Sequence, residues 1–452
     1  MAGFLGTRVG RWLAAVIGAT LLIAAALVIG REIPGRPVIA LAAVAVVLAL
    51  GVTAADAALI PLLLLPVVFV IHRVSAGALD LSISDAALGL ATLVALVFTK
   101  RPFSAPLRNL LWLTVLYQFA TLFTVVANPF LANAVEWVHA WTLVGGALVV
   151  GWTIGRGGHA RAGLTLVMVT ALVLAMITIA QGLRQYAGGD FQPVYVSWPY
   201  GMHKNFIGTV VAFAAVVAYA RPVWLGWPRR WSLSVFWILA VAIAFTQSRQ
   251  AIMGLGVALL LIALRGDRHR RRSKVIVVAV IPALFFVGTL VKDQLASGNA
   301  FNSANQRLTW FQDTLTAWER SPWVGYGLRF WNQPGAPLHF QPPNAELEVL
   351  ASAGIIGLLG FLALVLGVLI VLWRIDPAYG TLAVAVVLSR FVQGQFDLFW
   401  VAGQVSVPFV VAGICLGVLE LRNEGQEPSQ RLVRAGLPAA VPPGPIPAET
   451  PR

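Results

Sequence analysis

The 452-residue chain contains few charged residues and a single cysteine. Only 11% of its residues are Asp, Glu, Lys or Arg, whereas soluble domains contain about a quarter. Hydrophobic residues make up 59%, and the mean hydropathy is +0.82. This composition excludes an ordinary soluble protein and predicts a polytopic membrane protein. The lone Cys415 excludes a disulfide framework and a cysteine metal cluster, and we interpret it as a small packed hydrophobe.

The chain also lacks the signatures of an enzyme that uses nucleotide sugars. Its basic segments contain neither an Asp-x-Asp pair nor a glycine-rich phosphate loop. This favours a lipid-linked donor over a nucleotide-linked one, and the sequence predicts no cofactor. The first apolar run follows Arg8 and Arg11 without a clear small-residue cleavage site, so we interpret it as a membrane helix rather than a signal peptide.

Apolar runs of membrane-spanning length fill most of the chain. They lie at residues 12–30, 37–54, 56–72, 86–99, 108–127, 136–155, 163–182, 205–220, 232–247, 250–264, 275–291, 346–373, 378–393 and 399–421. The predicted fold is therefore an all-α polytopic membrane protein. It has about 12–14 transmembrane helices and one large external loop with short helices of its own.

Four regions follow from this division. Residues 1–291 form the N-terminal transmembrane helices, interrupted by a short external segment at about 183–204. Residues 292–344 form the large external loop, and residues 345–421 form the C-terminal transmembrane helices. The proline-rich segment 422–452 shows no periodicity and is predicted to be a disordered cytoplasmic tail.

The formal net charge of +14 reflects orientation rather than nucleic-acid binding. Basic residues are concentrated in alternate connections: Lys100, Arg101, Arg108, Arg156, Arg161, Arg221, Arg229, Arg230, the run 265–274 and Arg374. The positive-inside rule makes that side cytoplasmic. The opposite side then contains segment 183–204, the turn at Ser248 and Arg249, the loop 292–344 and the turn at 390–397.

Two groups of residues on the external side are suited to an anion. Arg249 lies in a very short turn between two apolar helices, where a charge is costly unless it is paired or hydrated, and its planar guanidinium fits a phosphate. His203, Lys204 and Asn205 begin the helix 205–220, where free N–H groups also favour an anion. The simpler alternatives are side chains that reach lipid headgroups and an aromatic belt at the membrane interface.

The large loop contributes further candidates. Its aromatic residues suit either sugar recognition or contact with the membrane surface. His339 is its only histidine and is a candidate general base, although a lone loop histidine is more often merely solvated. Glu346 and Glu348 at the start of the next helix are competing bases, and they also suit a helix N-terminus.

The second half of the chain resembles the O-antigen ligase and O-antigen polymerase superfamily of bacterial membrane glycan transferases. Four stretches in a characteristic order carry the resemblance: 203–208, 246–249, 307–327 and 344–357. It implies transfer of a glycan, without a metal, from an undecaprenyl-pyrophosphate carrier to lipid A core or another surface acceptor. The reaction would occur at the outer, periplasmic face of the bacterial cytoplasmic (inner) membrane.

The resemblance also implies roles for individual residues. In the family, external arginines hold the pyrophosphate and a histidine at the end of the large loop activates the acceptor. Arg249 matches the arginine of the short turn, and Lys204, His203, Asn205, Arg307 and Asn344 are the other predicted pyrophosphate-binding residues. Asn344 keeps the family's spacing to the glycines of the next helix, but Pro343 occupies the histidine position. His339 is the candidate replacement.

Other functions remain open from the sequence. A polymerase of lipid-linked repeat units would share the same motifs. A lipid or glycan transporter is a different class, but no internal repeat supports it and the external charges lie near helix ends. A non-catalytic scaffold in glycan assembly is a third possibility that the proline at position 343 keeps open.

Overall fold

The computed structural model describes residues 51–76, 79–99, 101–265, 288–289, 292 and 303–434. The predicted helices at 12–30, 37–54 and 275–291 lie largely outside these residues, as does most of 292–302. The described elements are α4 (Leu59–Leu64), η1 (Leu65–Phe69), β1 (Arg73–Ala76), β2 (Leu79–Ser82), α5 (Ile83–Phe98), α6 (Ala105–Ala127), α7 (Leu131–Trp141), η2 (Thr142–Gly146), α8 (Ala147–Arg156), α9 (Ala160–Ala187), α10 (Lys204–Ala220), η3 (Val223–Leu225), α11 (Arg229–Thr246), α12 (Arg249–Leu264), α14 (Ser303–Glu319), η4 (Phe330–Asn332), α15 (Ala345–Arg374), α16 (Pro377–Gly394) and α17 (Ser406–Arg434).

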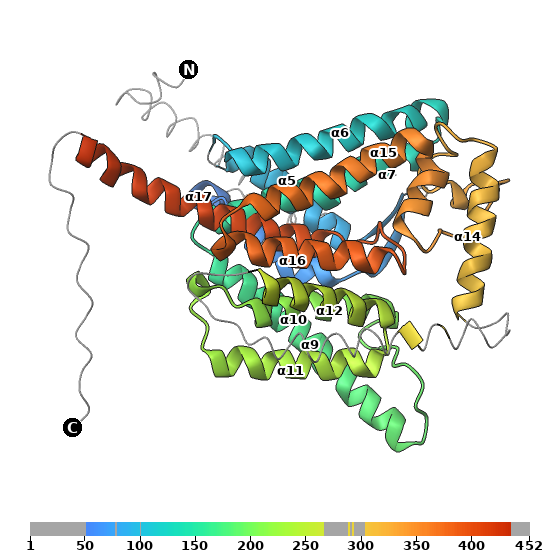
Figure 1. Cartoon of the computed structure of the whole chain (residues 1–452), viewed down its shortest axis with the longest axis horizontal. Coiled ribbons are helices and arrows are strands. Elements are labelled where there is room, and N and C mark those ends of the chain that lie inside the picture. The colour runs from blue at the N-terminus through green and yellow to red at the C-terminus, as the bar shows by residue number, and fades with distance from the viewer. Residues whose placement is uncertain are drawn as a thin grey trace, which may run out of the picture.

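The predicted fold class is confirmed: the chain is an all-α polytopic membrane protein. Among the described residues, six helices are long and apolar enough to cross a membrane: Ala105–Ala127, Leu131–Arg156, Ala160–Ala187, Arg229–Thr246, Ala345–Arg374 and Ser406–Gly425. Four further apolar helices, such as Lys204–Ala220, are shorter. The long helices run side by side, and α14 lies across one end of the bundle (Figure 1). We call this the α14 end.

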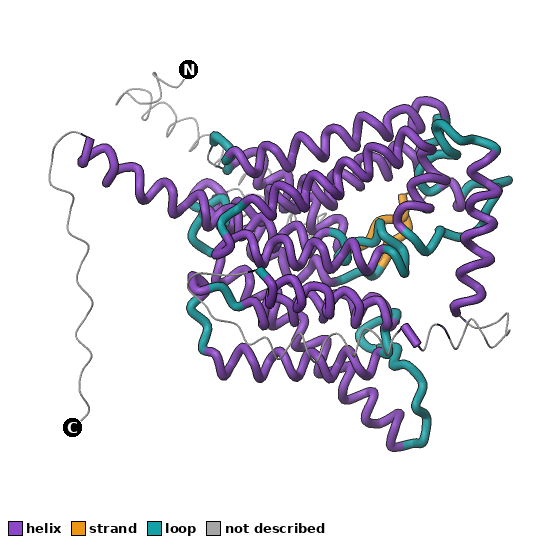
Figure 2. Tube along the Cα trace, viewed as in Figure 1, coloured by secondary structure: helices purple, strands orange, loops and turns teal. Residues whose placement is uncertain are grey.

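Two details differ from the sequence predictions. β1 and β2 pair as a short antiparallel hairpin with Arg73 opposite Ser82, and this hairpin is the orange segment in Figure 2. Ser82 then begins α5 with a reciprocal cap, because its hydroxyl accepts from the N–H of Asp85 while the Asp85 carboxylate accepts from the N–H of Ser82. At the other end of the chain, α17 continues as a helix to Arg434, although the sequence predicts disorder from Arg422.

Glycines allow α8 and α17 to pack backbone against backbone. A Cβ atom on Gly151 would lie 2.0 Å from the carbonyl oxygen of Val410, and one on Gly413 would lie 2.3 Å from that of Leu148. Small residues permit such close approach in membranes, where packing rather than hydrophobic exclusion drives helix association. Cys415 lies on α17 in this tightly packed region and is only 1% exposed. It is the buried hydrophobe that the sequence predicts.

The long helix α15 is interrupted at Gly354, which has φ 64° and ψ −166°. The backbone groups freed by this break bond to the turn that follows α14. Tyr326 N–H donates to the Ala351 carbonyl (3.1 Å), and Ile355 N–H donates to the Pro322 carbonyl (2.8 Å). Irregular backbone at membrane depth needs such partners within the protein. The break therefore fixes the large loop to the transmembrane bundle.

Candidate functional site

Three basic side chains from three separate helices meet at the α14 end. Lys204 begins α10, Arg249 begins α12 and Arg307 lies in the first half of α14. Lys204 interacts electrostatically with both arginines and with Asp397, in the connection between α16 and α17. We call Lys204, Arg249, Arg307 and Asp397 the cationic cluster. With three cations and one carboxylate, it carries an excess of positive charge.

The starts of α10 and α12 touch each other directly. Ser248 Oγ donates to Asn205 Oδ1 at 3.4 Å. A Cβ atom on Gly208 would lie 2.7 Å from the Ser248 Cβ, so no larger residue fits between the helices without displacing one of them. Two helix N-termini thus point into the same region, where the helix dipoles favour an anion.

Arg307 joins the cluster from the large loop. It is partly buried, and this burial lowers the pKa of its guanidinium; Asp397 raises that pKa and the positive charge of Arg249 lowers it again. The influence of Asp397 and that of Arg249 on this pKa both require Arg307 to lie close to the start of α12 and to the connection between α16 and α17. The sequence predicts this convergence only by placing all three basic residues on one side of the membrane.

Asp397 is the acidic member of the cluster that the sequence analysis missed. Its Oδ2 accepts a hydrogen bond from Gln250 Nε2 at 2.7 Å, which ties the α16–α17 connection to the start of α12. It also interacts with His203 and with the fully buried Arg390. The available signal was a carboxylate in an external turn next to Arg390, because charges at membrane depth are functional candidates.

His203 caps α10 and borders the cluster. Its Nδ1 accepts from the Asn205 N–H at 3.2 Å, so the other ring nitrogen carries the proton when the ring is neutral. Partial burial lowers the pKa of the imidazole; Asp397 opposes this effect and Lys204 adds to it. His203 therefore supports the helix N-terminus as a neutral ring rather than as a further cation.

This assignment predicts how stability depends on pH. Because the folded-state pKa of His203 is lowered, the cap contributes above the ordinary histidine pKa of about 6.5 and is lost as the pH falls below it. Replacing His203 by Asn keeps a cap that does not titrate, and should remove up to about 1 kcal/mol of this acid destabilisation. Thermal unfolding of both proteins between pH 8 and pH 5 measures it. Parallel curves would contradict the assignment.

Asn344, Glu346 and Glu348 form a second polar group at the start of α15. Asn344 caps the helix by accepting from the Leu347 N–H (3.0 Å) and donates to the carbonyl of Gln395 (3.2 Å). Gln395 Nε2 donates to Glu346 (2.8 Å).

Glu348 is only 2% exposed, and its two oxygens accept from Gln341 Nε2 (2.8 Å) and the Phe399 N–H (3.3 Å). All three residues thus have structural partners.

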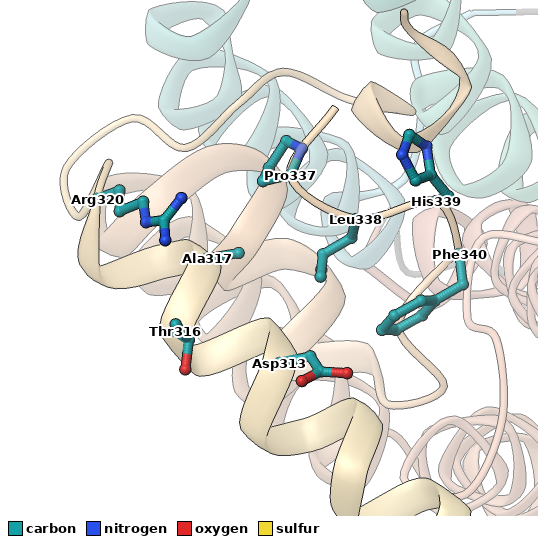
Figure 3. A pocket seen from close by; sticks show the side chains of 8 residues that line it. All are labelled: Asp313, Thr316, Ala317, Arg320, Pro337, Leu338, His339 and Phe340. Carbon is teal, nitrogen blue, oxygen red and sulfur yellow. The ribbon is translucent and has the colours of Figure 1, made fainter. Parts of the chain in front are cut away.

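His339 lies apart from these groups, on an open cavity of about 390 Å³ between α14 and the returning loop (Figure 3). The cavity is lined by Asp313, Thr316, Ala317, Arg320, Pro337, Leu338, His339 and Phe340. His339 is exposed, and its ring points away from the neighbouring side chains of Leu338 and Phe340. The cavity lining includes no member of the cationic cluster. A single helix, α14, connects the two places because it carries Arg307 as well as the cavity residues Asp313 and Thr316.

A buried network of charged residues on α5 and α7 binds the large loop through Arg329. His139 Nε2 lies 2.8 Å from Asp85 Oδ1, and His139 Nδ1 lies 3.0 Å from Glu136 Oε1. Glu136 also pairs with the loop residue Arg329, at 3.1 Å. Sequence reasoning missed this network, although Glu136 and His139 stand three residues apart in an apolar run and would have been a valid signal.

The helices and the cationic cluster define a multi-pass membrane protein with a site suited to an anionic ligand. A family model described as O-antigen ligase matches residues 234–362, which contain Arg249, Arg307, His339 and the break at Gly354. The predicted resemblance to the O-antigen ligase and polymerase superfamily is thereby confirmed over this part of the chain. A comparison with curated protein sequences found no significant match. The family match supports glycan transfer of the O-antigen ligase kind, with a lipid-linked glycan and an acceptor as substrates.

Proposed function

We propose that this protein transfers a glycan from an undecaprenyl-pyrophosphate carrier to lipid A core or another surface acceptor, without a metal. The α14 end then faces the outside of the cytoplasmic membrane, and the basic connections face the cytoplasm. The observation that carries the proposal is the convergence of Lys204, Arg249 and Arg307 beside two helix N-termini. A pyrophosphate is the anionic group that this arrangement fits.

The cluster would act on the leaving group. When the bond between the first sugar and the pyrophosphate breaks, negative charge develops on the bridging oxygen. Cations held in a partly buried site stabilise that charge more than water does, because they need no reorganisation as the bond breaks. Asp397 would offset the repulsion among the cations in the absence of substrate and, through Gln250, keep the start of α12 in place.

His339 is the most accessible of the three candidate bases. The acceptor hydroxyl oxygen would attack C1 of the donor sugar, the bond from C1 to the pyrophosphate oxygen would break, and the hydroxyl proton would pass to His339. Glu348 is buried with both oxygens hydrogen-bonded, and Glu346 is held by Gln395. We propose that these two carboxylates and Asn344 position the start of α15.

Replacing His339 by Gln should lower the rate of transfer by about a hundredfold or more, because the acceptor proton loses its base. Affinity for the lipid-linked donor should stay unchanged, since His339 lies outside the cationic cluster. The assay uses purified protein in nanodiscs, a lipid-linked glycan and a lipid acceptor. The control is His159→Gln, because His159 pairs with Asp56 and lies outside the cluster and the His339 cavity.

The outcomes separate the assignments. Near-normal transfer by His339→Gln, together with loss of transfer by Glu348→Gln in a folded protein, would move the base to Glu348. Longer lipid-linked glycans formed without an acceptor would identify a polymerase. Movement of the substrate across vesicles without any transfer would support a transporter instead.

A further inference from the structure

Residues 194–202, between α9 and α10, form an anchored external segment beside the cationic cluster. Val194 and Val196 are buried, and the Val194 N–H donates to the carbonyl of Phe245 at 3.1 Å. The Met202 N–H donates to the carbonyl of Val196 at 2.7 Å and closes the segment on itself. The backbone is thus held at both of its ends.

The middle of the segment is anchored as well. The Tyr200 hydroxyl accepts from the Ile71 N–H at 3.1 Å and donates to the carbonyl of Phe69 at 3.2 Å. Gln181, at the end of α9, donates to the carbonyl of Tyr195 at 2.6 Å. A segment with this many fixed points presents its remaining side chains in defined positions.

Two aromatic rings on this segment remain open to the outside. Tyr195 is 48% exposed and Trp198 is 70% exposed, although the neighbouring Val194 and Val196 are buried. The Tyr195 ring packs edge-on against His203, with ring centroids 5.2 Å apart and an interplanar angle of 80°. His203 directly precedes Lys204 in the chain. Tyr195 therefore contacts the residue next to a member of the cationic cluster.

We propose that Tyr195 and Trp198 form a subsite for the sugar next to the pyrophosphate of the lipid-linked donor. The inference rests on the proposed function. A sugar presents polarised C–H groups on its ring faces, and the negative face of an aromatic ring attracts them. The first sugar is joined directly to the pyrophosphate, so it must lie beside the phosphates that Lys204 and Arg249 hold. The anchored backbone keeps the two rings available without a large loss of conformational freedom on binding.

The proposal predicts selective effects on donors that carry a sugar. Trp198→Ala and Tyr195→Ala should each weaken binding of a glycosylated undecaprenyl pyrophosphate by about three- to tenfold. Binding of undecaprenyl pyrophosphate without a sugar should not change. Phe at either position keeps the ring and should restore the affinity. The loss should raise KM more than it lowers kcat, because the rings bind the sugar in both the ground state and the transition state.

A matched control is Phe191→Ala. Phe191 is 68% exposed and belongs to the same external connection, but its ring packs against Tyr186, whereas that of Tyr195 packs against His203. Its loss should leave both affinities unchanged. Equal weakening of both ligands by Trp198→Ala and Tyr195→Ala would overturn the subsite and indicate that the rings contact the lipid or the membrane interface.

The same titrations distinguish failure of the subsite from failure of the proposed function. If Arg249→Ala weakens both ligands while the two aromatic variants bind them normally, the pyrophosphate site stands and the sugar subsite is wrong. If Arg249→Ala binds both ligands as the unmodified protein does, or if the unmodified protein binds neither, the proposed function itself is wrong and the subsite fails with it.

Discussion

Replacing Arg249 by Ala should reduce glycan transfer on the order of a hundred- to a thousandfold. The side chain stands at the first position of α12, within electrostatic range of Lys204 and of Arg307. A planar guanidinium can hold two phosphate oxygens at once, whereas a lysine offers a single ammonium. Arg249→Lys should therefore retain part of the activity. The chain should still fold, because Arg249 is only half buried.

The measurement compares initial rates of transfer in nanodiscs, together with thermal unfolding of each variant. Arg184→Ala is the matched control, because Arg184 is an exposed arginine near the end of α9, outside the cationic cluster. Its rate should equal that of the unmodified protein. If Arg249→Ala transfers glycan at the normal rate, the cluster does not hold the pyrophosphate.

Replacing Gly354 by Ala should have the second large effect, this time on folding. A Cβ atom on Gly354 would lie 2.2 Å from the carbonyl carbon and oxygen of Trp323. The positive φ of 64° adds strain of about 1–3 kcal/mol for any residue with a side chain. Relief of the clash requires the turn at 322–327 to leave α15. Both stability and transfer should then be lost.

Gly335→Ala is the variant that distinguishes the backbone strain of a positive φ from the steric clash with Trp323. Gly335 lies in the same loop and also has a positive φ, 75°, but nothing lies within 4 Å of a Cβ at that position. It should lower stability by the strain alone and leave transfer largely intact. Thermal unfolding and transfer assays of both variants test this comparison. Equal effects of the two substitutions would mean that contact between the loop and the α15 break is not what holds the loop.

The fold was predictable because the membrane imposes a simple pattern on the sequence. Apolar runs of sufficient length must be helices, since backbone groups in lipid need partners within their own segment. The predictions were weaker where the pattern is interrupted. A glycine in an apolar run can be a packing contact or a break, and only the structure distinguishes Gly354, which interrupts its helix, from Gly151, which faces α17.

The candidate site was partly predictable for a related reason. Charge asymmetry places Lys204, Arg249 and Arg307 on one side, but their convergence depends on how α10, α12 and α14 pack. The sequence predicts Asn344 and His203 as pyrophosphate-binding residues and does not predict that they cap helices, and the Gln395 partner of Asn344 is far away in the sequence. Asp397 went unnoticed although its charge, in the same external turn as Arg390, made it a functional candidate.

The burial of Cys415 has a practical consequence for the orientation of the protein. It is the chain's only cysteine and it lies among tightly packed helices, so it offers almost no surface to a thiol reagent. A cysteine introduced in place of the 65%-exposed Trp323 would then be the one readily labelled thiol. In intact cells, a maleimide that cannot cross the membrane would label this position only if the α14 end faces outward. The native sequence is thus already a suitable background for mapping the two faces of the molecule chemically.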